Sequence, residues 1–273
     1  MLNRREFFRN SAIAAAAGLS CKGTAGTSES TPAFELGVAS YTFRAFDLQQ
    51  TLEFTNRLGV KNIAFKSMHL PLDSTEAQIK SAIQTTTNAG IHCYGCGVVY
   101  MKSKEEVDRA FEYARIAGMK TIIGVPEPEW LQRVSEKAAE YDIQVAIHNH
   151  GPEDETYPTP ESIYEKITDL DPRLGICVDI GHTKRAGVNP AEAVRQFSDR
   201  VLDVHIKDVN KAEAAGETVE IGRGVIDIPE FLKALIGIGY SGYVSLEYEK
   251  DKNDPIVGAA ESVGYVRGVL AAL

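Results

Sequence analysis

Four short apolar segments in the second half of the chain end in side chains that bind metals or transfer protons. The imidazoles and carboxylates at their ends are common ligands of Zn²⁺, Mn²⁺ and Co²⁺. Burying such groups is costly unless they are paired or hold a cation. The segments 143–149, 174–179, 201–207 and 242–248 therefore predict one divalent metal ion held by His148, Asp179, His205 and Glu247.

The alternation of side chains along these segments supports the same four residues. Residues two apart on a strand share a face. In 201–207, His205 and Lys207 alternate with Val204 and Ile206, and the other three segments alternate in the same way. A single polar residue at a strand end is usually satisfied locally, but four at matching depth on consecutive strands favour a shared site.

The rest of the chain repeats the same unit of a short apolar run followed by an amphipathic segment. Eight strands and eight helices are predicted from this alternation. The strands are expected at 35–41, 61–66, 91–98, 120–125, 143–149, 174–179, 201–207 and 242–248. The helices are expected near 48–58, 75–89, 104–118, 128–141, 160–169, 190–198, 228–238 and 256–271.

Eight strand–helix repeats within residues 34–273 predict a single (β/α)₈ TIM barrel of the α/β class. A doubly wound open sheet is the alternative, and it usually carries a glycine-rich phosphate turn after its first strand. Here the first strand runs into Ser40-Tyr41-Thr42-Phe43-Arg44, which contains no glycine. The barrel is therefore favoured, with its active site at the C-terminal ends of the strands.

The first 21 residues predict an export signal. Arg4 and Arg5, followed by a small apolar run at 11–19, resemble a twin-arginine signal, and the run is too short to cross a membrane. Cys21 ends a sequence that resembles a lipoprotein processing site, so lipidation and simple cleavage both stay open. Residues 22–33 are small and polar, which predicts a flexible linker. We expect an exported protein, periplasmic or anchored at the cell envelope by a lipid.

Charge and cysteine content exclude some other classes of protein. The net charge is −9, and residues 1–33 hold four cations and two carboxylates, so the body carries −11. An acidic body repels the phosphate backbone of nucleic acids. Cys93 and Cys96 form a C-x-x-C pair, but no second pair accompanies it and it does not open a helix. We expect these two thiols to be buried in the core.

The polar segments also resemble a known family. The motifs Asp179-Ile180-Gly181-His182 and His205-Ile206-Lys207-Asp208, with His148-Asn149-His150 and Ser245-Leu246-Glu247, are similar to the metal motifs of the xylose-isomerase-like superfamily. This superfamily contains sugar isomerases, epimerases, inosose dehydratases and AP endonucleases. The resemblance covers nearly all of residues 34–273. It implies the ligand set named above, and it implies that His182 contacts substrate or a second metal.

The resemblance implies proton removal next to a carbonyl, with a Lewis-acid metal (Mn, Zn, Co or Mg) stabilising an enediolate. Return of the proton, or loss of a β-hydroxyl, then decides the product. In this scheme Glu247 is the candidate base, and His150, Lys207 and Lys66 are its candidate partners. The residues expected to bind sugar hydroxyls are Tyr41, His182, Arg223 and Glu249.

Two departures from the family pattern affect the mechanism. His148 stands where many epimerases have a glutamate, and Lys66 stands where the family often has another. Both argue against epimerisation by two glutamates. An export signal favours a free, oxidised or glycosidically linked carbohydrate over an intracellular phosphorylated sugar. The prediction is a metal-dependent isomerase, epimerase or lyase that acts on a free or oxidised keto-sugar.

Two other functions are weighed against this one. An AP endonuclease needs three metals and a basic surface for DNA. Here the body is acidic, and the first three strands lack the extra histidine and glutamate ligands. A non-catalytic lipoprotein that binds metal and sugar stays open, because a barrel can persist without its chemistry. The expected partner is a small carbohydrate, and any membrane contact is through a lipid on Cys21. The substrate, the metal and the oligomeric state stay open.

Overall fold

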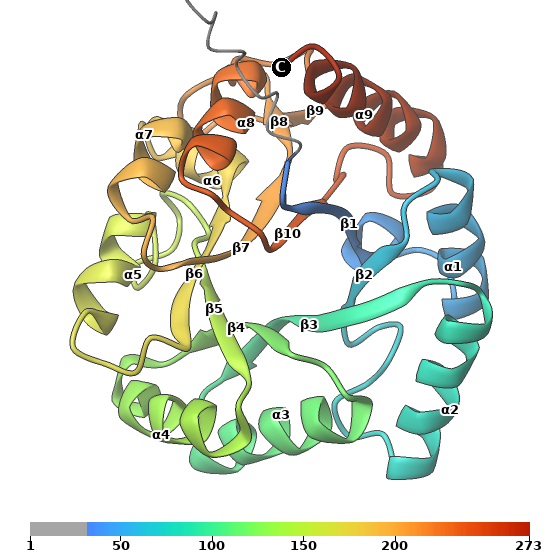
Figure 1. Ribbon diagram of the computed structural model, residues 1–273, viewed down its shortest axis with the longest axis vertical. Helices are drawn as coiled ribbons and strands as arrows, with labels where there is room; N and C mark the ends of the chain where they lie inside the picture. Colours follow the sequence, from blue (N-terminus) through green and yellow to red (C-terminus); the bar gives the residue numbers. More distant parts are fainter. Residues whose placement is uncertain (1–31) are drawn as a thin grey trace, which may run out of the picture. The chain divides into compact units, whose positions relative to one another are not determined.

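The computed structural model describes residues 32–273, in which eight parallel strands close into a barrel (Figure 1). Neighbouring strands follow the order β1-β10-β7-β6-β5-β4-β3-β2 around the ring. The strands are β1 (Glu35–Ala39), β2 (Asn62–Phe65), β3 (His92–Met101), β4 (Thr121–Pro126), β5 (Gln144–His148), β6 (Leu174–Asp179), β7 (Val201–Ile206) and β10 (Tyr243–Leu246). The predicted (β/α)₈ barrel is confirmed. The predicted export signal, Cys21 and most of the predicted linker lie outside the described residues.

Helices follow the strands and surround the barrel (Figure 1). They are α1 (Leu48–Arg57), α2 (Glu76–Asn88), α3 (Lys104–Ala117), α4 (Leu131–Tyr141), α5 (Pro160–Ile167), α6 (Ile180–Arg185), α7 (Pro190–Gln196), α8 (Ile228–Gly237) and α9 (Pro255–Leu270). Several begin at side chains that accept a backbone N–H, as Asp47 does from Gln50 and Thr159 does from Ser162. None of the helices between residues 32 and 273 is long and apolar enough to cross a membrane.

Three short elements were not expected from the sequence, and all of them lie in loops that follow strands. They are the 3₁₀ helix η1 (Ser40–Phe43) after β1, helix α6 after β6, and the two-stranded hairpin β8 (Asp208–Val209) with β9 (Thr218–Val219) after β7. A second 3₁₀ helix, η2 (Pro128–Trp130), begins the predicted helix at 128–141. Each is too short to show a hydrophobic period.

The interior of the barrel is filled by side chains rather than left as a channel. Ala64, Ile123, Ala146 and Cys177 pack there around Tyr94. The Tyr94 hydroxyl lies 2.6 Å from the hydroxyl of Ser245, and its ring stacks on Tyr243 at 3.9 Å. This packed layer forms a floor beneath the polar residues at the C-terminal ends of the strands.

The two cysteines of the C-x-x-C pair are free and buried, as expected from the sequence. Both lie within β3. Burial raises the pKa of the Cys96 thiol to about 12 and raises the pKa of Cys93 further, so neither thiol is ionised at neutral pH. Among the described residues these thiols belong to the hydrophobic core.

The close contact between β6 and β7 generates a stability prediction. A β-carbon on Gly175 would overlap the carbonyl oxygen of Arg200 and the side chain of Leu202. Gly175→Ala should therefore lower the free energy of unfolding by about 1–3 kcal/mol. Gly264 lies in α9 with open space around it, so Gly264→Ala should raise stability by about 0.5–1 kcal/mol. The midpoint of thermal unfolding tests both predictions. Equal midpoints for the unaltered chain and Gly175→Ala would contradict the close packing of β6 against β7.

Candidate metal centre

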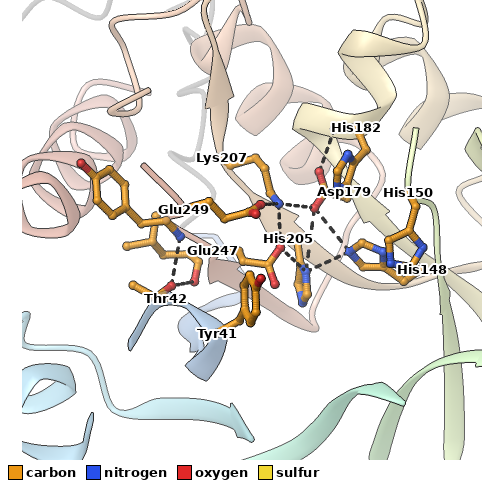
Figure 2. Close-up of polar contacts among 12 residues, drawn as sticks. Tyr41, Thr42, His148, His150, Asp179, His182, His205, Lys207, Glu247 and Glu249 are labelled. Carbon is orange, nitrogen blue, oxygen red and sulfur yellow. Dashed lines mark hydrogen bonds and ion pairs between the residues drawn. The ribbon is translucent and has the colours of Figure 1, made fainter. Parts of the chain in front are cut away.

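The four predicted ligands meet at the C-terminal mouth of the barrel (Figure 2). His148 is the last residue of β5, Asp179 is the last of β6, His205 lies in β7, and Glu247 follows β10. One nitrogen or oxygen from each lies within 4.8 Å of the others, and all four side chains are buried. Adjacent parallel strands bring their C-terminal ends to the same rim, which is why residues far apart in sequence meet here.

The spacing of the donor atoms fits a four-coordinate divalent ion. His148 Nε2 lies 3.1 Å from His205 Nδ1 and 3.3 Å from Asp179 Oδ2. Glu247 Oε2 lies 3.4 Å from His205 Nδ1. A tetrahedral ion with bonds of ~2.1 Å separates its ligands by ~3.4 Å. Two imidazoles and two carboxylates at this spacing can therefore hold one such ion.

The turn after β6 aims Asp179 at this centre. Its Oδ1 accepts a hydrogen bond from the backbone N–H of His182 at 2.9 Å and caps α6. Its own N–H donates to Oδ1 of Asn149, whose amide nitrogen donates to the hydroxyl of Thr183. Asp179 Oδ2 is buried, and it lies 2.9 Å from Lys207 Nζ and 3.3 Å from His148 Nε2. The cap thus holds one carboxylate oxygen, and the other points into the cluster.

Lys207 lies closest to the acidic ligands. Its Nζ is 2.9 Å from Asp179 Oδ2 and 2.6 Å from Glu247 Oε2, and it also donates to Glu249. Burial lowers the pKa of Lys207, but these carboxylates outweigh burial and hold its pKa well above the ordinary value. Gly181 leaves room for the lysine stem, because a β-carbon there would meet Lys207 Cγ at 2.5 Å. Lys207 is thus a fixed positive charge rather than a proton acceptor.

The predicted partners His150 and Lys66 lie on another side of the mouth. The His150 ring is 4.4 Å from that of His148, and its Nδ1 is 3.3 Å from Asp154 Oδ2. Lys66 Nζ donates to the carbonyl of Val98 at 2.8 Å. Burial lowers the pKa of Lys66, and the charge of Glu247 partly offsets this. The two side chains are candidate proton donors or acceptors beside the cluster.

Three of the four predicted sugar-binding residues lie at this mouth. The His182 ring is 5.9 Å from the rings of His148 and His150. Glu249 accepts from Lys207, and the Tyr41 ring is 5.9 Å from Lys66 Nζ. Arg223 is not brought to the cluster. Its exposed guanidinium pairs with Glu261 of α9, because the turn after β9 packs against that helix.

Several residues with contacts to the site were not assigned a role from the sequence. Asp203 lies beneath His205, with Oδ2 3.8 Å from His205 Nε2, and it accepts from the thiol of Cys177. Burial raises the pKa of Asp203 to about 6. Its position two residues before His205 on the same strand face could have indicated this contact. Tyr100 contacts His150 but lies beyond the predicted end of its strand at residue 98.

Residues 52–269 match the family described as xylose isomerase-like TIM barrel. An inosose dehydratase from Lacticaseibacillus casei is 27% identical over 155 residues, which cover 50% of this chain and 51% of that protein. The matched stretches make up between 41% and 55% of the curated relatives, so the chain spans about half their length.

Two solved structures share the fold with TM-scores of 0.72. One is an L-ribulose 3-epimerase, which is 17% identical and aligns over 88% of this chain and 95% of that one. The other is an IolI protein with a bound zinc atom, which is 20% identical and aligns over 88% and 99%. At these identities the likeness establishes the fold alone.

The predicted ligand set is tested by changing one charge without disturbing the helix cap. Asp179→Asn keeps an oxygen that can cap α6, since Asn and Asp cap helices about equally well. It removes the anionic ligand, so affinity for added Zn²⁺ should fall by at least about tenfold. Metal content is measured by elemental analysis after dialysis against zinc.

The matched control is Asp227→Asn, because Asp227 caps α8 by the same kind of bond to Glu230, at 3.0 Å. This control should bind zinc like the unaltered chain. Equal zinc content in both variants would mean that Asp179 is not a ligand.

Proposed function

The chain belongs to the xylose isomerase-like TIM barrel family, and on this premise we propose that it is a metal-dependent, carbohydrate-modifying enzyme. The reaction class is isomerisation, epimerisation or elimination on a free or oxidised sugar. The observation that carries the proposal is the convergence of His148, Asp179, His205 and Glu247 around one point at the barrel mouth.

A resident divalent ion is the first part of the proposal. The four donors fit Zn²⁺, Mn²⁺ or Co²⁺ better than Mg²⁺, because two of them are imidazoles. The zinc atom of the structurally similar IolI protein supports the same kind of site. When bound, such an ion supplies Lewis-acid stabilisation of negative charge on substrate oxygens.

Glu247 is the proposed base. Its Oε2 faces His205 and Lys207, whereas its Oε1 accepts no hydrogen bond from the part of the chain that the structure describes. That oxygen can take a proton from a carbon next to a carbonyl. The fixed charge of Lys207 and the contact with His205 keep the carboxylate oriented while the proton moves.

The opposite side of the mouth supplies His150 and Lys66 rather than a second free carboxylate. Glu249 is engaged by Lys207, and Asp154 lies behind His150. No other carboxylate of residues 32–273 has a contact with this cluster that would let it act as a second free base. This asymmetry favours isomerisation or elimination over epimerisation by two carboxylates. In an elimination, the electron pair of the broken C–H bond expels a β-oxygen, which takes a proton from His150 or Lys66.

The proposed class of substrate follows from the names of the related proteins and structural neighbours. Its relatives include an inosose dehydratase, and its structural neighbours include an L-ribulose 3-epimerase. The substrates that these two names give, inosose and L-ribulose, are polyhydroxylated carbonyl compounds. The mouth of this barrel offers matching groups, since Tyr41, His182 and Glu249 surround the ligands with donors and acceptors (Figure 2).

Exchange of carbon-bound hydrogen tests the proposed base. Aldoses and ketoses are incubated in deuterium oxide with the zinc-loaded or manganese-loaded chain, and deuterium uptake and new double bonds are followed by NMR. Glu247→Gln should lower exchange at least about a hundredfold. Glu230→Gln, which alters a surface carboxylate paired with Arg195, should leave it unchanged.

Metal content is measured in the same samples, because Glu247 is also a proposed ligand. Loss of exchange with metal retained identifies the base. Sugar binding without exchange or elimination by the unaltered chain would instead support the non-catalytic binding protein.

We also propose that the protein is exported through its twin-arginine sequence. Replacing Arg4 and Arg5 by lysine should keep the precursor inside the cell, because the arginine pair is the feature that such a route reads. Cell fractionation and immunoblotting measure this. Cys21→Ala should release the protein from the envelope if Cys21 is lipidated, and equal fractionation of all variants would contradict the export proposal.

A further inference from the structure

We propose that the rim around Tyr100 is a second sugar-binding subsite, so that the preferred substrate is a glycoside with two rings rather than a free monosaccharide. This inference rests on the proposed function and narrows its substrate class from a free or oxidised sugar to a glycosidically linked one. It is carried by the position of Tyr100, by two hollows beside it, and by polar groups in those hollows that have no partner in the described structure.

Tyr100 is held at the mouth by the long strand β3. That strand continues to Met101 and pairs Tyr100 with Val125 of β4. The Tyr100 hydroxyl is 3.4 Å from His150 Nε2, and the two rings are nearly parallel with centroids 6.0 Å apart. His150 in turn contacts His148 of the metal centre. Tyr100 therefore lies one side chain outward from the centre, where the next ring of a bound glycoside would reach.

The ring of Tyr100 is partly exposed at the rim of the mouth. Tyr100 is 49% exposed. Met68, two residues after Lys66, is 45% exposed. The ammonium groups of Lys66 and Lys102 lie over the Tyr100 ring, 5.7 and 5.8 Å from its centre. The exposed part of the ring can pack against the C–H groups of a sugar, whose hydroxyls hydrogen-bond to the donors beside it.

Two hollows meet at this side chain. One has a volume of about 360 Å³, and Tyr100 lines it together with Ser67, Asp73 and Arg109. The other, of about 130 Å³, lies on the side of Lys102 and Glu127 and is also lined by Tyr100. The larger falls in the range of about 300–1,000 Å³ that is usual for small-molecule sites.

Three exposed polar side chains of these hollows are available to a ligand. The side chains of Asp73, Arg109 and Glu127 make no hydrogen bond or ion pair with other residues between 32 and 273. Cations and carboxylates are interspersed, since Asp73, Glu106, Glu127 and Asp154 line the same two hollows as Lys102 and Arg109. A mixed set of this kind suits neutral hydroxyl groups and disfavours a phosphate or sulfate.

The test compares disaccharides with their component sugars by isothermal titration calorimetry on the zinc-loaded full chain. The probes are cellobiose, maltose, lactose, sucrose and trehalose, against glucose, galactose and fructose. We expect at least one disaccharide to bind about tenfold more tightly than its components, as expected when a second ring stacks on an aromatic face.

Variants assign this advantage to the subsite. Tyr100→Ala should reduce the ratio of disaccharide to monosaccharide affinity to near one, and Tyr100→Phe should keep most of it. Arg109→Ala should lower the ratio severalfold, and because this side chain is exposed its loss leaves the fold intact. Tyr265→Ala is the matched control, since Tyr265 is 39% exposed on α9 and outside both hollows.

Three results would overturn the inference: no sugar of the panel binds, monosaccharides bind as tightly as every disaccharide, or Tyr100→Ala and Arg109→Ala both leave the ratio unchanged. The proposed function fails separately. If disaccharides bind through Tyr100 but no sugar exchanges hydrogen or undergoes elimination, the subsite is supported and the proposed enzymatic function is not. If exchange occurs and the ratio is unaffected by both Tyr100→Ala and Arg109→Ala, only the subsite fails.

Discussion

Asp179 and Glu247 place two carboxylates within a few ångströms of each other in the buried mouth of the barrel. The surrounding structure must offset the repulsion between these two charges. Two like charges 4 Å apart repel by about 4 kcal/mol at an effective dielectric constant of 20. The ammonium group of Lys207 lies between them and offsets this repulsion. The imidazoles of His148 and His205 add further donors, so a site that can hold a cation exists as part of the folded core.

The barrel contributes rigidity to this cluster. Its floor is a packed layer around Tyr94, and the ligands stand on strand ends whose register is fixed by hydrogen bonds on both sides. The glycine of the turn after β6 lets the Lys207 stem pass close to the backbone. Sites built on strands in this way hold their geometry more closely than sites on loops.

The fold alone does not decide the reaction. Dehydratases and epimerases both occur among the proteins that resemble this chain, and the same barrel serves them all. The mouth of this barrel has an uneven distribution of charge. Acidic ligands and Lys207 lie on one side, whereas His150, Lys66 and Tyr100 lie on the other. Under the proposed function, the reacting ring lies against the first side and the rest of the substrate lies against the second.

The sequence by itself determined the barrel and its four candidate ligands, because both depend on local periodicity. Strand parity follows from backbone geometry, so the inward position of His205 and Glu247 needed no tertiary information. The tertiary structure alone decided which charges pair. Lys207 reaches three carboxylates, Arg223 turns away to Glu261, and β3 runs past its expected end through an irregular register to bring Tyr100 to His150. These contacts join strands and loops distant in sequence. Their distances depend on register shifts and loop packing, which no local pattern encodes.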